Sequence, residues 1–246
     1  MFIIYRLYNK ENFILHRVKG FTLAEVLITL GIIGIVSALT LPTLMSNCRK
    51  YVIETQLKEF YSIMNQALKR AEYDYDDMDG WTWPHKTKVD ITDGNQTVEA
   101  NNSDYEWFQK YLQPYIKTST LKESFHLYCV WYDGFAVEFI NGTGMSCGTD
   151  EGGGNVEIGK FVCMFYPKAG TIKDIQDYSA KSQKVVSGKD YFVFQINTEG
   201  KDKGFQPVDS NNCKKSTGMR YLPSVGCAKL IKDNNWKFPK DYPIKI

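Results

Sequence analysis

The sequence lacks most of the patterns that mark a metal site or a nucleic-acid partner. Its 30 basic and 28 acidic side chains nearly cancel over 246 residues, so bulk charge gives no reason to expect that nucleic acid is required. None of the six cysteines forms a CxxC pair, and the three histidines are scattered, which argues against a structural zinc site. We identify neither a GxSxG nor an HExxH motif, and no nucleophile with its base. We therefore expect no cofactor, no metal and no catalysis.

What is present is a long apolar segment near the amino terminus. From Phe21 to Met45 there are 25 residues, and Glu25 is the only ionisable one. At about 1.5 Å per helical residue, this length spans a hydrocarbon core of about 30 Å. The preceding twenty residues carry one acid, Glu11, and four bases, which are Arg6, Lys10, Arg17 and Lys19. By the positive-inside rule they stay cytoplasmic, and the chain after Met45 is exported.

Three simple interpretations leave Glu25 unexplained. The segment has the length of a plain membrane anchor, of a secretory signal with VSA at 36–38 as its cleavage site, or of a buried helix in a soluble core. A carboxylate in a membrane span costs about 2.5 to 3.5 kcal/mol on insertion scales, and none of these interpretations requires one.

The order of residues around Gly20 resembles the processing site of type IV prepilins and of type II secretion pseudopilins. Lys19 and Gly20 are followed by FTLAEV and the apolar run. The resemblance implies that a prepilin peptidase cuts after Gly20 and methylates the new amino terminus at Phe21. Counted from Phe21, Glu25 is the fifth residue and Pro42 the twenty-second, the positions where the family carries a glutamate and a proline that kinks the helix.

The resemblance also gives these residues roles. Gly20 has no side chain, so an extended backbone can approach the acid pair of the peptidase. Cleavage creates a charged amine at Phe21. We hypothesise that Glu25 pairs with the Phe21 amine of a neighbouring subunit, so that each charge offsets the cost of burying the other.

Beyond the membrane segment, the pattern predicts that the helix continues. Apolar residues recur at steps of three and four up to about Asp76, namely Val52 or Ile53, Leu57, Phe60, Met64, Ala67 or Leu68, and Ala71. We expect Glu54 and Lys58 to pair on another face. The predicted organisation is a leader at 1–20, a transmembrane and assembly helix at 21–45, an amphipathic continuation at 46–76 and an exported domain at 77–246.

The exported part reads as a small α+β domain. Gly80 is expected to end the helix within the acidic stretch 73–81, which suits a solvated turn better than a calcium loop. We predict an exposed loop at 83–102, a short helix at 103–115, and two strands within 126–140 joined at Asp133 and Gly134. A glycine-rich loop at 141–155 and strands at 160–167 and 190–200 follow. An antiparallel sheet packed on the second half of the long helix is also the pilin plan.

The cysteines of an exported domain are candidates for disulfides. Pilin-like proteins often carry a disulfide near the carboxyl end, which implies a bridge between Cys213 and Cys227. A loop of about 15 residues closed in this way would stabilise the fold by about 3 kcal/mol in the chain-entropy model. One further bridge is expected among Cys129, Cys147 and Cys163, with the pair left open, and Cys48 is expected to be free.

The resemblance implies a structural subunit, a pseudopilin or minor pilin polymerised into a type II secretion pseudopilus or type IV pilus-like filament that serves protein secretion. Its implied partners are the prepilin peptidase, an inner-membrane assembly platform protein, a motor ATPase acting indirectly, and other pilin or pseudopilin subunits. Its implied location is the bacterial inner membrane and then the filament. The alternatives are a minor type IV pilin with an adhesive or DNA-uptake head, and an exported enzyme held on an anchor.

Overall fold

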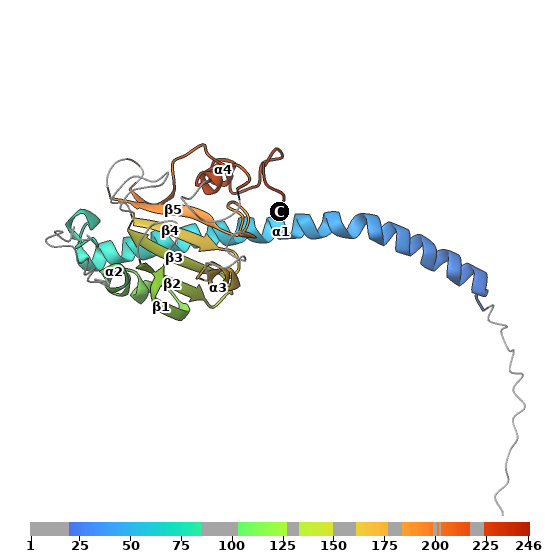
Figure 1. The fold of residues 1–246 in the computed structure, drawn as a ribbon, viewed down its shortest axis with the longest axis horizontal. Coiled ribbons are helices and arrows are strands. Elements are labelled where there is room, and N and C mark those ends of the chain that lie inside the picture. Colours follow the sequence, from blue (N-terminus) through green and yellow to red (C-terminus); the bar gives the residue numbers. More distant parts are fainter. Residues whose placement is uncertain are drawn as a thin grey trace, which may run out of the picture. The chain divides into compact units, whose positions relative to one another are not determined.

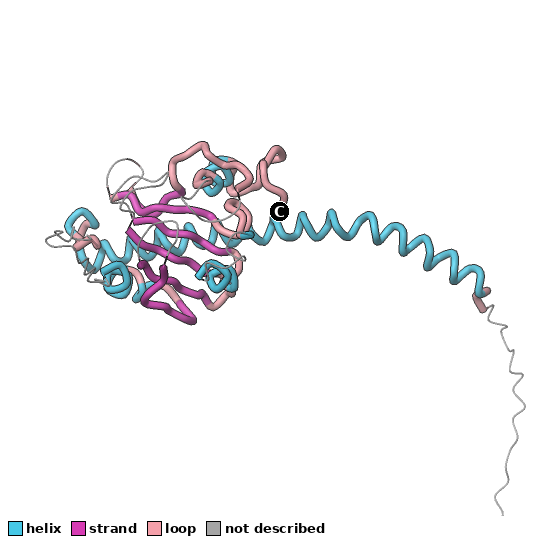
Figure 2. The backbone as a smooth tube through the Cα atoms, in the orientation of Figure 1, coloured by secondary structure: helices cyan, strands magenta, loops and turns pink. Residues whose placement is uncertain are grey.

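The computed structural model describes residues 20–84, 103–126, 133–149, 161–176, 184–198, 201, 203–216 and 224–246. The helices are α1 (Leu23–Tyr75), α2 (Ser103–Tyr111), α3 (Gly170–Gln176) and α4 (Cys227–Asp233), with short 3-10 turns at Met78–Gly80 and Gln113–Tyr115. The strands are β1 (Thr118–His126), β2 (Asp133–Phe139), β3 (Gly144–Thr149), β4 (Phe161–Tyr166), β5 (Phe192–Asn197) and β6 (Gly204–Pro207) (Figures 1 and 2). The chain divides into two compact units between Met45 and Ser46.

The strands of the second unit form one antiparallel sheet. They lie in the order β1-β2-β3-β4-β5-β6, so every strand pairs with its neighbour in the sequence. This order is a meander in which the connection from β4 to β5 contains α3, and the second half of α1 packs along one face of the sheet (Figure 1). The predicted α+β fold, a long amino-terminal helix on an antiparallel sheet, is confirmed.

The apolar stripe of α1 forms the centre of the core. Its buried apolar residues are Ile53, Leu57, Phe60, Met64, Ala67, Leu68 and Ala71, as the three- and four-residue spacing predicts. At the first position Ile53 is buried, whereas Val52 is 50% exposed. The Phe60 ring lies 4.5 Å from Phe165 and 5.4 Å from Phe194, centroid to centroid. Phe60 therefore joins the helix to two central strands.

Both faces of the central strands are buried. In β4, Phe161, Cys163 and Phe165 belong to the core on the α1 side. The alternate residues Val162, Met164 and Tyr166 belong to a second cluster with Ile172 of α3. Because side chains alternate along a strand, a strand covered on both sides has no polar face. This explains the unbroken apolar run from which β4 was predicted.

The predicted hairpin turn at Asp133 and Gly134 is wrong. Both residues belong to β2, where Asp133 pairs with His126 and Gly134 with Phe125 of β1, and residues 127–132 lie outside the described part of the chain. Gly134 serves close packing: a Cβ built on it would lie 2.1 Å from the carbonyl oxygen of Cys147 in β3. An Asp-Gly pair therefore marks a close backbone approach here and not a turn.

Gly134→Ala should lower the free energy of unfolding by about 1 to 3 kcal/mol, because backbone atoms of β2 and β3 must move apart. The matched control is Gly170→Ala at the start of α3, where a Cβ meets no atom within 4 Å, and its change should stay within about 0.5 kcal/mol. Urea unfolding of the oxidised full chain in a non-ionic detergent measures both. Equal effects of the two substitutions would contradict the proposed crowding.

The predicted glycine-rich loop at 141–155 is also wrong in part. The turn covers residues 140–143, Gly144–Thr149 forms β3, whose six residues are all buried, and residues 150–155 lie outside the described part of the chain. A Cβ on Gly144 would lie 2.5 Å from Cδ1 of Ile172, so the glycine allows α3 to lie against the strand. The small residues of this strand allow close packing. A loop has a similar composition, so the sequence alone does not distinguish the two.

The long helix ends where predicted, near Asp76, but Gly80 is not the residue that ends it. It stops at Tyr75, and Asp76 has a left-handed backbone with φ of 64°. Aspartate tolerates this conformation better than most residues, so Asp76 takes the position often held by glycine after a helix. The short helix predicted at 103–115 is present as α2 and the turn Gln113–Tyr115, and the predicted loop at 83–102 lies outside the described residues from 85 onward.

Candidate processing and assembly site

The segment that carries Gly20, Phe21 and Glu25 begins outside regular structure. Gly20 is exposed and precedes α1, which starts at Leu23, and a Cβ built on Gly20 meets no atom within 4 Å. Phe21 is 88% exposed. The peptide bond between Gly20 and Phe21 therefore precedes the helix, where the backbone is free to enter a peptidase site in an extended form.

Thr22 and Glu25 hold the start of α1 through reciprocal hydrogen bonds. The Thr22 backbone N–H donates to Oε2 of Glu25 at 2.8 Å, and the Thr22 hydroxyl donates to the same oxygen at 2.9 Å. In return the Glu25 backbone N–H donates to the Thr22 hydroxyl at 3.2 Å. This is a capping box, and it satisfies backbone donors that the first turn of a helix leaves unpaired.

The capping box gives Glu25 a partner within its own chain. This intrachain partner is not among the predicted roles of Glu25, although Thr-x-x-Glu before an apolar run is the recognised signal of a capping box. A carboxylate at a helix amino terminus is also favoured by the helix dipole. Pairing of Glu25 with the amine of a neighbouring subunit stays a prediction.

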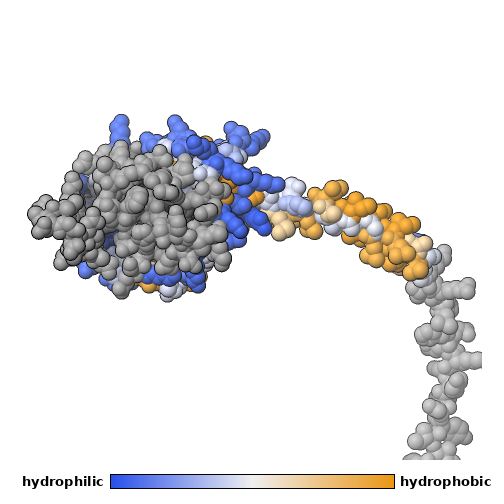
Figure 3. All heavy atoms as spheres, in the orientation of Figure 1, coloured by the Kyte–Doolittle hydropathy of each residue, from blue (hydrophilic) through white to orange (hydrophobic). Residues whose placement is uncertain are grey.

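The remainder of the first unit presents apolar side chains on its surface. Leu23, Leu27, Ile28, Ile35 and Leu39 are each more than 60% exposed. Figure 3 shows hydrophobic residues covering this part of α1. The helix contains a window with mean hydropathy of 2.2, none of which is buried, so it is long and apolar enough to cross a membrane. By the same test a signal sequence would also qualify.

Pro42 lies inside α1, which is helical on both sides of it. Proline lacks the amide hydrogen that would bond to the carbonyl four residues earlier. Local unwinding at this position is not seen, and the kink stays a prediction.

In the second unit, Glu54 is not the surface partner of Lys58 that the sequence predicted. It is 9% exposed, its Oε2 accepts from Nζ of Lys237 at 2.8 Å, and its Oε1 accepts from the backbone N–H of Phe238 at 2.8 Å. The hydrogen bond raises the pKa of Lys237. A nearly buried carboxylate on the helix thus fixes the carboxyl-terminal tail, 183 residues away in sequence.

The acidic turn after α1 is held by one lysine. Nζ of Lys203 bonds to Asp77 and lies 3.5 Å from Asp79 and 3.6 Å from Glu72. The pKa of Asp77 is lowered by the N–H of Asp79 and then by Lys203. Within the described residues, no group of three or more His, Cys, Asp and Glu side chains is placed to hold a metal ion.

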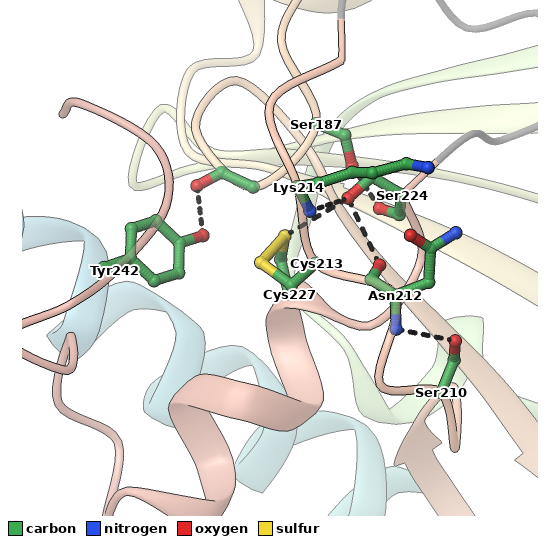
Figure 4. The surroundings of a disulfide bond; sticks show 9 residues. Ser187, Ser210, Asn212, Cys213, Lys214, Ser224, Cys227 and Tyr242 are labelled. Atoms are coloured by element: carbon green, nitrogen blue, oxygen red, sulfur yellow. Dashed lines mark hydrogen bonds between the residues drawn. A yellow bond between two sulfur atoms is a disulfide. The ribbon is translucent and has the colours of Figure 1, made fainter.

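The pair of cysteines implied by the resemblance is bonded: Cys213 is joined to Cys227 at the start of α4 (Figure 4). Nearby, the Ser224 hydroxyl accepts from the N–H of Lys214 at 2.9 Å and donates to the carbonyl of Asn212 at 3.2 Å. These contacts fasten the loop before α4 to the chain on either side of the bridge.

The second disulfide joins Cys147 and Cys163, which face each other on β3 and β4. Cys48 is free and exposed, as expected. Cys129, the third candidate for this bridge, lies outside the described residues.

Gly144–Gly148, GMSCG, fits the GxSxG spacing of serine hydrolases, contrary to the expectation that no serine motif is present. That motif acts at a sharp turn between a strand and a helix, where the serine is exposed. Here Ser146 lies in the middle of β3 with no exposed surface, and its hydroxyl is 2.6 Å from that of Tyr166. The geometry of this pentapeptide is that of a packed strand.

Comparison with known families supports the resemblance found at the amino terminus. Residues 15–41 match the prokaryotic N-terminal methylation motif, the prepilin-type signal. This motif supports a type IV pilin-like subunit, and the long helix packed on an antiparallel sheet is consistent with a pilin-like fold. Residues 43–246, more than half of the chain, match the model described as a family of unknown function (DUF6613), and the chain belongs to that family. No curated protein and no solved structure matches the chain.

Proposed function

We propose that the chain is a structural subunit that a prepilin peptidase cleaves between Gly20 and Phe21 and methylates at Phe21, and that polymerises through α1. The observation that carries this proposal is the methylation motif at 15–41, which coincides with an exposed scissile bond just before a membrane-length apolar helix. The proposed product is a type II secretion pseudopilus or a type IV pilus-like filament that serves protein secretion. The mechanism is assembly, with no chemical step performed by this chain.

The proposed organisation follows from that mechanism. Residues 1–20 form a cytoplasmic leader that is removed, 21–45 anchor the subunit in the inner membrane and later contact other subunits, and 46–76 carry the exported domain at 77–246. The apolar surface of the first unit supports this division, since it satisfies lipid before assembly and neighbouring helices afterwards. An assembly platform protein would transfer subunits from the membrane into the fibre.

Glu25 is proposed to select the axial register during assembly. A carboxylate in an apolar helix bundle is favoured only where a donor meets it, and the Phe21 amine of a neighbour is such a donor. Only one axial offset between two subunits brings this pair together. The charge would therefore favour that offset over others that bury similar apolar area.

Assembly tests the role of Glu25. The chain and its variant Glu25→Ala are expressed with a type II secretion or type IV pilus apparatus, and subunits are measured in the sheared filament fraction and in the membrane. Wild type is expected in both fractions, and Glu25→Ala in the membrane but at least tenfold reduced in filaments, a loss of about 1.4 kcal/mol or more per contact. Glu25→Gln, which keeps the shape without the charge, should behave as Glu25→Ala does.

Assembly of both variants at the wild-type level would contradict the charge-pairing role of Glu25. The choice between a pseudopilus and a pilus is tested separately by the neighbouring genes. A secretin and a secretion ATPase are expected if the fibre is a pseudopilus, and a retraction motor with pilus genes if it is a pilus.

A further inference from the structure

Five basic residues gather where the second unit begins. Arg49 and Lys50 lie on α1 directly after the apolar segment, and Lys237, Lys240 and Lys245 lie on the carboxyl-terminal tail. We call these five residues the basic cluster. All are exposed except Lys50, which is half-buried.

Two sets of contacts bring the tail to this end of α1. Glu54 binds Lys237 and the N–H of Phe238, as described above. At the other end of the tail, the Ser46 hydroxyl donates to the carbonyl of Ile246 at 3.3 Å. The tail therefore runs back along α1 from Glu54 to Ser46, a helical rise of about 12 Å. Lys240 and Lys245 lie between these two attachment points in sequence.

The charge of this surface differs from that of the chain as a whole. The tail from residue 234 to 246 and α1 from 46 to 54 contain the five cations but only two acidic side chains, Glu54 and Asp241. Glu54 is nearly buried and already bonded to Lys237. Asp241 is the one exposed acid there, whereas the whole chain has 30 basic and 28 acidic residues.

The position of the cluster follows from the sequence. Ser46 comes directly after Met45, the last residue of the apolar run, and Arg49 lies about 5 Å further along the helix axis. The headgroup layer on each side of the hydrocarbon core is about 5 to 7 Å thick. If Phe21–Met45 spans the bilayer as proposed above, Arg49, Lys50 and the end of the tail beside Ser46 lie at the headgroups, and Lys237 beside Glu54 lies about 13 Å beyond the apolar run.

We propose that the basic cluster binds the anionic headgroups of the leaflet that faces the exported domain. Lysine side chains are long and flexible, and they reach phosphate groups while their carbon stems cover apolar surface. Because the tail is fixed to α1 through Glu54 and Ser46, its cations add to those of the helix within about 12 Å along the helix axis. Removal of the leader takes away Arg6, Lys10, Arg17 and Lys19, so the cluster remains as the basic region beside the anchor.

The test uses the full chain in nanodiscs made of phosphatidylcholine alone or with one third phosphatidylglycerol. Hydrogen exchange is measured on peptides covering residues 46–58 and 234–246. Exchange in the tail is expected to slow by about threefold in the anionic discs, and half-molar salt should remove the difference because it screens charge beyond about 4 Å.

A matched pair of variants assigns the effect. The variant Arg49→Gln/Lys240→Gln/Lys245→Gln should lose the slowing while exchanging as wild type does in phosphatidylcholine, which shows that its tail is still attached. Lys237 is kept because it pairs with Glu54. The control Lys69→Gln/Lys117→Gln/Lys173→Gln removes three exposed lysines elsewhere and should keep the slowing.

Three results would overturn the proposal. Equal exchange in both kinds of disc would show that lipid charge is not recognised. Slower exchange that persists in the cluster variant would show that the lipid contact lies elsewhere. Loss of the slowing in the control variant would show that the effect depends only on net charge. An acidic protein partner for this surface would give equal exchange in the two discs. The measurement needs neither cleavage nor assembly, so failure of the pilin function would not be confused with failure of lipid binding.

Discussion

Gly20→Glu should abolish removal of the leader completely. Co-expressed with a prepilin peptidase, the wild-type chain is expected to lose residues 1–20, and the variant to keep them. The reason is local to the peptidase, since a side chain at this position would separate the scissile backbone from the acid pair. In the chain itself the position is open, with no atom within 4 Å of a Cβ, so the substitution leaves the rest of the fold unchanged. Intact-mass measurement and amino-terminal sequencing read the outcome.

The matched control is Gly31→Ala, a second glycine of the same segment with open space around it. It lies within α1, eleven residues after the cleavage site, and its processing should equal that of wild type. Complete retention of the leader by the wild-type chain would overturn the proposed function. Cleavage of the wild-type chain and of Gly20→Glu alike at VSA, 36–38, would instead support an ordinary secretory signal.

Phe60→Ala should lower the free energy of unfolding of the second unit by about 3 to 5 kcal/mol, because it removes a buried aromatic ring and leaves a cavity. The ring is 3% exposed and contacts Phe139, Phe165, Phe194 and Phe205, at centroid distances of 4.5 to 6.0 Å. Aromatic pairs at such distances add to the burial term. The site cannot collapse easily, since the rings around it belong to hydrogen-bonded strands.

Tyr73→Ala on the same helix is the control. Tyr73 is also aromatic but is 91% exposed, and its loss should change stability by no more than about 0.5 kcal/mol. Urea unfolding of the oxidised full chain in detergent, followed by circular dichroism, measures both variants. A loss below about 1 kcal/mol for Phe60→Ala would contradict the central role assigned to this residue.

The features that sequence predicted well depend on neighbouring residues. The methylation motif occupies consecutive positions, and the stripe from Ile53 to Ala71 repeats at the period of one helix. Strand β4 appears as an unbroken apolar run because both of its faces are buried. In each case the signal and the structure share the same short stretch of chain.

The features that sequence missed depend on distant partners. Glu54 looked like a surface residue because Lys58 is one turn away, whereas its partner Lys237 follows only after the whole sheet. The glycines of strand β3 predict a loop. In the structure they allow close contacts with β2 and α3, which no local pattern reveals. The capping box is a different case, since Thr22 and Glu25 carry its local signal in neighbouring positions of the sequence.

The capping box changes how the free subunit should be pictured. A carboxylate without a hydrogen-bond donor is unfavourable in a membrane. It would move toward the headgroups, bind water or pair with another group. Because Glu25 already accepts hydrogen bonds from the N–H and the hydroxyl of Thr22, it has donors before any neighbour arrives. Assembly would then be an exchange of partners in place of a first encounter. If the chain assembles as proposed, such an exchange would keep the carboxylate hydrogen-bonded both in the free subunit and in the fibre.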